Sequence, residues 1–170
     1  MPVHYSMCET DVLNLVQRVM GKYHPDLTKA GVTVDCVYAA DPDGPALKLH
    51  GYACAAVIKK ISYKQRVAGR ADAEITLDKD HWDDCTEPQK EALVDHELTH
   101  LVLVLDQNNR PKLDGADRPR FKMRLHDWEL GGFGEVARRH GKAAPEVICA
   151  RGFKQEFGQL CFDFGKTPAA

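Results

Sequence analysis

The sequence predicts an α+β fold in which a small, mostly antiparallel sheet packs against several helices. Three observations carry this prediction. Apolar residues recur at helical spacing over residues 11–23. Residues 31–39 alternate and are rich in β-branched residues, and the apolar residues of 71–78 alternate as well. A capped, apolar helix is expected over 86–105. The order is therefore helix, strands, helix, loop and helix, which is typical of an α+β layout.

The chain has 170 residues, of which 44% are hydrophobic and 28% are charged, so we expect one domain, residues 1–170, with a substantial core. The formal net charge of -2 does not indicate a nucleic-acid-binding protein, although a basic run over 110–124 leaves such a contact open. We find no membrane span, no signal peptide and no internal repeat. The six cysteines form no C-x-x-C pair, so we expect reduced core thiols and a cytoplasmic protein.

The helix over 86–105 has the clearest local signals. Thr86 and Gln89 have the spacing of a capping box, and Pro88 is tolerated in a first turn. We expect five residues to form the buried stripe of this helix: Val94, Leu98, Leu101, Val102 and Leu105. The polar stretch 107–124 is expected as a long loop, followed by helices over 126–141 and 146–159.

The sequence His96-Glu97-Leu98-Thr99-His100 lies within this helix. Residues four apart share one face of a helix, so both imidazoles can bind one ion, and zinc suits imidazole ligands. Glu97 lies about 100° round the helix from His96, where it can act as general base on a water bound to that ion. The alternative interpretation is a chance spacing of two histidines, but a buried pair with no partner would be costly.

A catalytic zinc site usually takes three protein ligands, and the third must come from later in the chain, because residues 103 and 106 are Leu and Asp. We favour His126 and keep Glu129 as the alternative ligand, since the two lie one helical turn apart in the expected helix. The one that is not a ligand, or Asp127, would orient a ligand ring. His140 is a weaker candidate near a helix end.

Three runs of the chain together resemble the family of putative phage metallopeptidases: 71-ADAEITLDKDHWDDCTEPQKEALVDHELTHL-101, 126-HDWEL-130 and 138-RRHG-141. The resemblance covers about residues 50–141, with Leu130 where the family has an aromatic residue, and leaves 142–170 as a C-terminal helical extension. It implies a zincin-like fold, distantly similar to SprT-like proteases and minimal gluzincins, and a phage or prophage origin. It also implies that His96, His100 and His126 bind zinc, that Glu97 is the base, and that an edge of the strand 71–78 pairs with an extended substrate.

The predicted function is therefore a zinc metallopeptidase that hydrolyses amide bonds of a peptide or protein substrate, with no membrane partner, located in the host cytoplasm if a phage encodes it. Three other functions stay open. The chain could be a zinc-binding interaction protein with little or no catalysis, or a DNA-associated SprT-like protease that uses the basic run 110–124. It could also hydrolyse an amide that is not a peptide. Glu97 favours an enzyme, because a structural zinc site needs no base.

Overall fold

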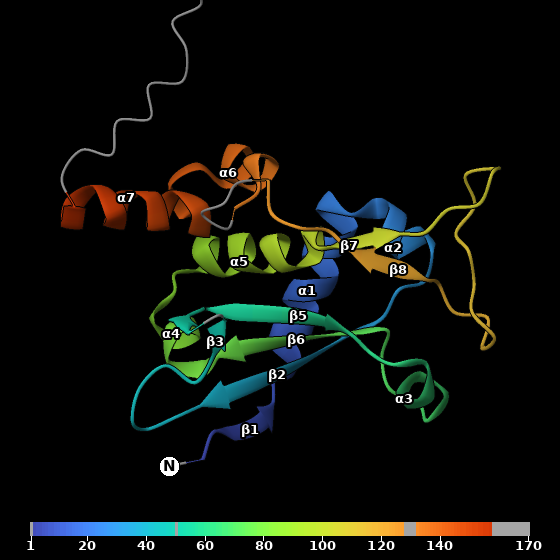
Figure 1. Cartoon of the computed structure of the whole chain (residues 1–170), viewed down its shortest axis with the longest axis horizontal. Helices are drawn as coiled ribbons and strands as arrows, with labels where there is room; N and C mark the ends of the chain where they lie inside the picture. The colour runs from blue at the N-terminus through green and yellow to red at the C-terminus, as the bar shows by residue number, and fades with distance from the viewer. Residues whose placement is uncertain (1, 50, 128–131, 158–170) are drawn as a thin grey trace, which may run out of the picture.

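The computed structural model describes residues 2–49, 51–127 and 132–157 (Figure 1). Helices and strands follow one another in this order: β1 (His4–Met7), α1 (Thr10–Tyr23), α2 (Pro25–Lys29), β2 (Val34–Ala40), β3 (Lys48–Leu49), β4 (Tyr52–Ala53), β5 (Ala56–Lys60), α3 (Tyr63–Val67), β6 (Ala73–Asp78), α4 (Lys79–Asp84), α5 (Glu87–Thr99), β7 (Leu101–Leu103), β8 (Phe121–Met123), α6 (Gly134–His140), the short 3-10 helix η1 (Gly141–Ala143) and α7 (Pro145–Phe157). The fold is a mixed α+β arrangement with small sheets, as predicted.

The main sheet has the strand order β1-β2-β6-β5, with β6 in the interior. Strand β6 runs parallel to β2 and antiparallel to β5, and β1 is antiparallel to β2, so two of the three pairings are antiparallel. All six residues of β6 are buried, because strands flank it on both sides and helices cover the sheet. The expectation that this strand offers an edge to a substrate is therefore wrong. The edges are β1 and β5.

Helix α5 lies between the sheet, α1 and the C-terminal helices, and contacts all of them (Figure 1). Its start is as predicted: the side chain of Gln89 accepts hydrogen bonds from the backbone N–H and the hydroxyl of Thr86, both at 2.8 Å. Every residue from Ala92 to Thr99 is buried. Because the helix is enclosed on several sides, its polar residues in this stretch must find partners inside the protein.

The predicted end of this helix is wrong. Helix α5 stops at Thr99 with His100 as its C-terminal cap, and the chain continues as β7, which pairs with β8. Leu101 and Leu103 are buried while Val102 between them is half-buried, so this apolar run alternates as a strand does. A short aliphatic run fits both periods, and the pairing with β8 decides between them.

The segment expected as a loop is an ordered arm, and it contains a repeat that contradicts our expectation of none: 105-LDQNNRPK-112 is followed by 113-LDGADRPR-120. Each copy closes a tight turn through its aspartate. Asp106 Oδ1 accepts from the N–H groups of Asn108 and Arg110, and Asp114 Oδ1 accepts in the same way from Ala116 and Arg118. Three backbone hydrogen bonds then form a closed ring: the N–H of Val104 donates to the carbonyl of Arg120, that of Arg120 to Lys112, and that of Lys112 to Val104.

Ion pairs fasten this arm to the body of the protein. Arg118 reaches the buried carboxylate of Asp72 at 2.8 Å, and Arg66 of α3 pairs with Asp114 at 2.5 Å. Arg118 also donates to the backbone carbonyl of Arg70. These contacts hold the second copy of the repeat in place. In the first copy the residue equivalent to Arg118 is Arg110, which is exposed.

The other differences concern short elements and helix starts. Strand β1 and helices α2, α3 and α4 were not predicted. Helix α6 begins at Gly134, so His126 lies before it in an irregular segment and not on the expected helix. Helix α7 lies close to the range predicted for the last helix. No helix among the described residues is long and apolar enough to cross a membrane, and the five cysteines described there are free.

Candidate metal centre

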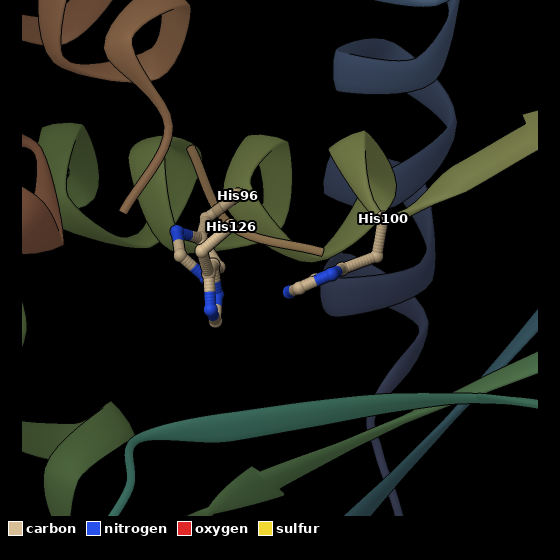
Figure 2. A group of neighbouring side chains, drawn as sticks. All are labelled: His96, His100 and His126. Atoms are coloured by element: carbon tan, nitrogen blue, oxygen red, sulfur yellow. The ribbon is translucent and has the colours of Figure 1, made fainter. Parts of the chain in front are cut away.

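Three histidines from two distant parts of the chain meet beneath α5 (Figure 2). His96 lies on α5, His100 caps its C-terminal end, and His126 follows β8. One nitrogen from each ring lies within 4.8 Å of the others, and the Nε2 atoms of His96 and His126 are 3.1 Å apart. Figure 2 shows the three rings pointing to the same side of α5, toward β5. This group of His96, His100 and His126 could hold a metal ion.

Hydrogen bonds at the far nitrogens fix two of these rings. His96 Nδ1 lies 2.8 Å from Oε1 of Glu146 on α7, and His100 Nδ1 lies 2.7 Å from the backbone carbonyl of Arg124. An ionised carboxylate and a carbonyl can only accept, so each Nδ1 donates. Nε2 of a neutral ring is then left with its lone pair, which is the form that binds a metal.

The side chain of Phe133 packs against all three rings. Its ring centroid lies 5.0 Å from those of His96 and His126 and 4.8 Å from that of His100. Phe133 is fully buried, and its backbone N–H donates to the same Oε1 of Glu146 that accepts from His96. The segment before α6 therefore covers the histidines with an apolar wall and holds Glu146 in position.

Burial favours the neutral form of two histidines of this site, His100 and His126. It lowers the pKa of His100 to about 4, with nearby His96 and His126 also disfavouring the charged form. Burial lowers the pKa of His126 as well. Neutral imidazoles at neutral pH are ready to act as ligands without first losing a proton.

Glu97 is also buried, with 4% of its surface exposed. Burial raises its pKa to about 7, although the proximity of His96 and a hydrogen bond from the backbone of Ile58 on β5 favour its ionised form. The carboxyl group therefore sits between α5 and β5 and changes its protonation state near neutral pH. A group of this kind can take up and release a proton in a reaction.

The opposite side of α5 carries an ionic cluster that the sequence analysis missed. Asp95 is fully buried, and its carboxylate contacts His24 at 2.7 Å, Arg139 at 2.9 and 3.0 Å, and His140 at 2.8 Å. Although burial alone would raise the pKa of Asp95, these three partners lower it below its usual value. His140, the weaker candidate for a third ligand, belongs to this cluster. A charged residue within an apolar helix is the only signal in the sequence.

The two other candidates from the motif after β8 fare differently. Asp127 bonds to the guanidinium of Arg124 at 2.8 Å and accepts from the N–H of Gly134 at 3.0 Å, at the start of α6. It thus fastens the segment that carries His126 and makes no hydrogen bond to a ligand ring. Glu129 lies outside the described residues. Glu146, which does bond to His96, was not a candidate because it lies 50 residues away in the sequence.

The basic run over 110–124 is divided by the fold. Arg118 and Arg124 form ion pairs with acidic residues of this chain. The remaining cations of the run are exposed and have no ion pair among the described residues: Arg110, Lys112, Arg120 and Lys122. The surface charge of the arm is therefore smaller than the sequence indicates.

Comparison with known proteins assigns the chain to a family. No curated protein and no solved structure matches the chain significantly. A family model described as "Putative phage metallopeptidase" matches residues 4–157. The match includes the three histidines, Glu97 and Glu146, and extends beyond the 50–141 of the sequence resemblance at both ends. The chain belongs to this family of phage metallopeptidases.

Proposed function

We propose that the protein is a zinc-dependent metallopeptidase, a single zincin-like domain over residues 1–170 that hydrolyses amide bonds of peptides or proteins. The observation that carries the proposal is the meeting of three imidazole nitrogens beside a buried carboxyl group of pKa about 7. Family membership supports a metal-dependent hydrolase. Zinc and proteolysis are our own inferences from the chemistry of these residues.

The residues fit a zinc ion. His96, His100 and His126 supply three imidazole nitrogens, and imidazole is a preferred zinc ligand. Burial lowers the pKa of His100 and of His126 and so favours their neutral, metal-binding form. Three protein ligands are typical of catalytic zinc sites, whereas structural sites usually use four. The buried Glu146 that accepts from His96 is the kind of partner that orients a metal-binding histidine.

When bound, zinc would supply a Lewis acid that polarises a substrate carbonyl and lowers the pKa of a water molecule. Glu97 would accept a proton from the attacking water and pass it to the leaving nitrogen. A general base works best when its pKa is near the working pH, and burial brings Glu97 there. Phe133 and the surrounding apolar residues would limit the access of bulk water to the histidines.

Strand β5 is our candidate for the element that holds the substrate. It forms an edge of the main sheet, and it contacts α5 next to Glu97. An extended peptide can add to such an edge through backbone hydrogen bonds. We propose this role for β5 in place of the strand 71–78, which lies in the sheet interior as β6.

The main alternative is a zinc-binding interaction protein without catalysis. Such a protein has no use for a buried carboxyl group whose pKa is raised to about 7, because burying it costs stability whenever it ionises. The enzyme is therefore the better explanation of Glu97. The same observation does not separate peptides from other amides as substrates.

The proposal is tested by incubating the zinc-loaded chain with an unstructured protein such as casein and identifying new N-termini by mass spectrometry. We expect cleavage that stops with a chelator and returns when zinc is added back. No cleavage by a chain that holds zinc, at any substrate concentration tried, would favour the interaction protein.

A further inference from the structure

A small pocket lies between α4, α5 and α7 and has no part in the chemistry described above. Its volume is about 170 Å³. It is lined by residues from α4, α5, α7 and the start of β5: Ala55, His81, Asp84, Cys85, Gln89, Leu93, Ala143, Pro145, Ile148 and Cys149. Most of the lining is apolar, and the polar side chains belong mainly to α4 and to the first turns of α5.

Helix α5 connects the pocket to the metal centre. Successive residues of a helix are rotated by about 100°, so Leu93 faces nearly the same direction as Glu97 and His100, one and two turns further on. Leu93 also faces within about 60° of His96. The floor of the pocket is therefore the N-terminal continuation of the helix face that carries the metal-binding histidines.

Two other walls of the pocket also lie next to parts of the proposed site. Pro145 and Ile148 lie on the first turn of α7, and Pro145 directly precedes Glu146, whose carboxylate contacts His96 at 2.8 Å. Ala55 directly precedes β5, the edge strand proposed to hold the substrate. A peptide that lay along β5 with its reacting carbonyl at the histidines would thus bring a neighbouring side chain to the pocket.

We propose that this pocket binds one apolar side chain of the substrate, of about the size of leucine or phenylalanine, next to the bond that is cleaved. The proposal rests on the proposed function and adds a substrate class to it. An apolar cavity of about 150 Å³ is large enough for a benzene molecule, so about 170 Å³ admits a side chain of that size. The side-chain oxygen of Gln89 is already occupied by Thr86.

A second depression is a useful contrast. Its volume is about 340 Å³, and it is lined by charges of both signs, among them Arg18, Glu91 and Arg139. It lies on the side of α5 that carries Asp95. Glu91 lies four residues before Asp95 and Glu87 lies eight residues before it, and residues at this spacing share one face of a helix. It therefore lies on a different side of α5 from Glu97, although Ala143 lines both pockets.

The test is the cleavage-site profile of the zinc-loaded full chain on a peptide mixture, read by mass spectrometry. We expect one position beside the cleaved bond to prefer leucine, phenylalanine or similar residues over glycine by about tenfold or more. In Ile148→Glu this preference should fall by about tenfold, and lysine or arginine should gain at that position, since the pocket wall acquires a negative charge. Ile148 is 39% exposed, so the fold should tolerate the change.

Ala150→Glu is the matched control, because it adds the same charge to an exposed position of α7 that does not line the pocket. Its profile should equal that of the parent. Cleavage without an apolar preference at any position, or with the same profile in Ile148→Glu and the parent, would overturn the pocket assignment and leave the peptidase in place.

A second readout separates the two proposals if no peptide is cleaved. Ligand-observed NMR should show N-acetyl-leucinamide binding more tightly than N-acetylglycinamide to the zinc-loaded parent, and losing that advantage in Ile148→Glu. In that case the peptidase proposal would fail while the pocket stands. Equal binding of both amides to the parent would overturn the pocket independently of any activity.

Discussion

Asp95 and Glu97 are two buried carboxyl groups on the same helix, on either side of His96, and their surroundings differ completely. Asp95 contacts an arginine and two histidines, and these partners lower its pKa. Burial raises the pKa of Glu97 to about 7 and outweighs the opposing effects of His96 and of the hydrogen bond from the backbone of Ile58. One side of α5 thus uses a charge to join elements together, whereas the other holds a proton acceptor close to neutrality.

The largest expected effect concerns turnover. Glu97→Gln should reduce the rate of peptide cleavage by about 10²- to 10⁴-fold, because the amide cannot take a proton from water. Asp95→Asn should change the rate per folded, zinc-loaded chain by only a few-fold. Cleavage rates normalised to zinc content check this contrast, which breaks down if the two variants lose activity equally.

The substitution at Asp95, which should change turnover only a few-fold, should lower the free energy of unfolding. Asp95→Asn removes the charge that His24, Arg139 and His140 share, and we expect a loss of about 3 kcal/mol in the free energy of unfolding. Glu87→Gln is the control, because its exposed pair with Lys90 should contribute less than about 1 kcal/mol. Urea unfolding of both variants measures the difference. A loss below about 1 kcal/mol in Asp95→Asn would show that the cluster does not stabilise the fold.

The pH dependence of the metal-free protein sharpens the comparison. Glu97 has a pKa of about 7 in the folded chain and 4.5 as its ordinary value, so the folded state binds more protons between these values. The free energy of unfolding should therefore fall as pH rises through this window, by up to about 3 kcal/mol. The contribution of Asp95 to the free energy of unfolding has the opposite pH dependence. It is present above the ordinary pKa of an aspartate and is lost in acid, as pH falls through the lowered pKa of the folded chain.

This pH effect is isolated by comparing the metal-free parent with metal-free Glu97→Gln at pH 5 and pH 8. Groups that do not interact with Glu97 contribute equally in both proteins, so their contributions cancel in the difference. Glu97→Gln should be the more stable of the two at pH 8 and lose its advantage at pH 5. An equal difference at both values would show that Glu97 titrates at an ordinary pKa.

The smallest expected effect lies outside the three ligands. Glu146→Gln keeps the shape of the side chain but removes the charge that faces His96, and we expect zinc affinity to fall by about 10- to 100-fold. Glu91→Gln is the control, because Glu91 bonds to Lys22 and Tyr23 on the side of α5 away from the histidines. Competition with a chelator of known affinity measures both. Unchanged affinity in Glu146→Gln would remove Glu146 from the site.

Local signals predicted the parts of the fold that depend on neighbouring residues. Helix α1 follows from the spacing of Val12, Val16 and Val19, and the start of α5 follows from the capping pair Thr86 and Gln89. The end of α5 could not be predicted, because Leu101–Leu103 becomes a strand only through its partner β8. Strand β5 likewise becomes an edge through the order of the whole sheet.

The candidate site likewise combines residues that local sequence signals predict with residues that only the packing of the fold brings together. His96 and His100 follow from a spacing of four on one helix, and His126 was named from its motif although it does not lie on the predicted helix. Glu146 and Phe133 reach the histidines only through the packing of α6 and α7 on α5, which no local pattern records. The repeat in the arm was present in the sequence and became evident from the equivalent turns that Asp106 and Asp114 close.

The central claim is that His96, His100 and His126 hold one zinc ion, and the most direct test is elemental analysis of the protein purified without chelator. We predict close to one zinc per chain in the parent and in His81→Ala, whose histidine is exposed and outside the group. His126→Ala should lose most of the metal while remaining folded by circular dichroism. No zinc in the parent after zinc is supplied, or equal zinc in the parent and His126→Ala, would contradict the claim.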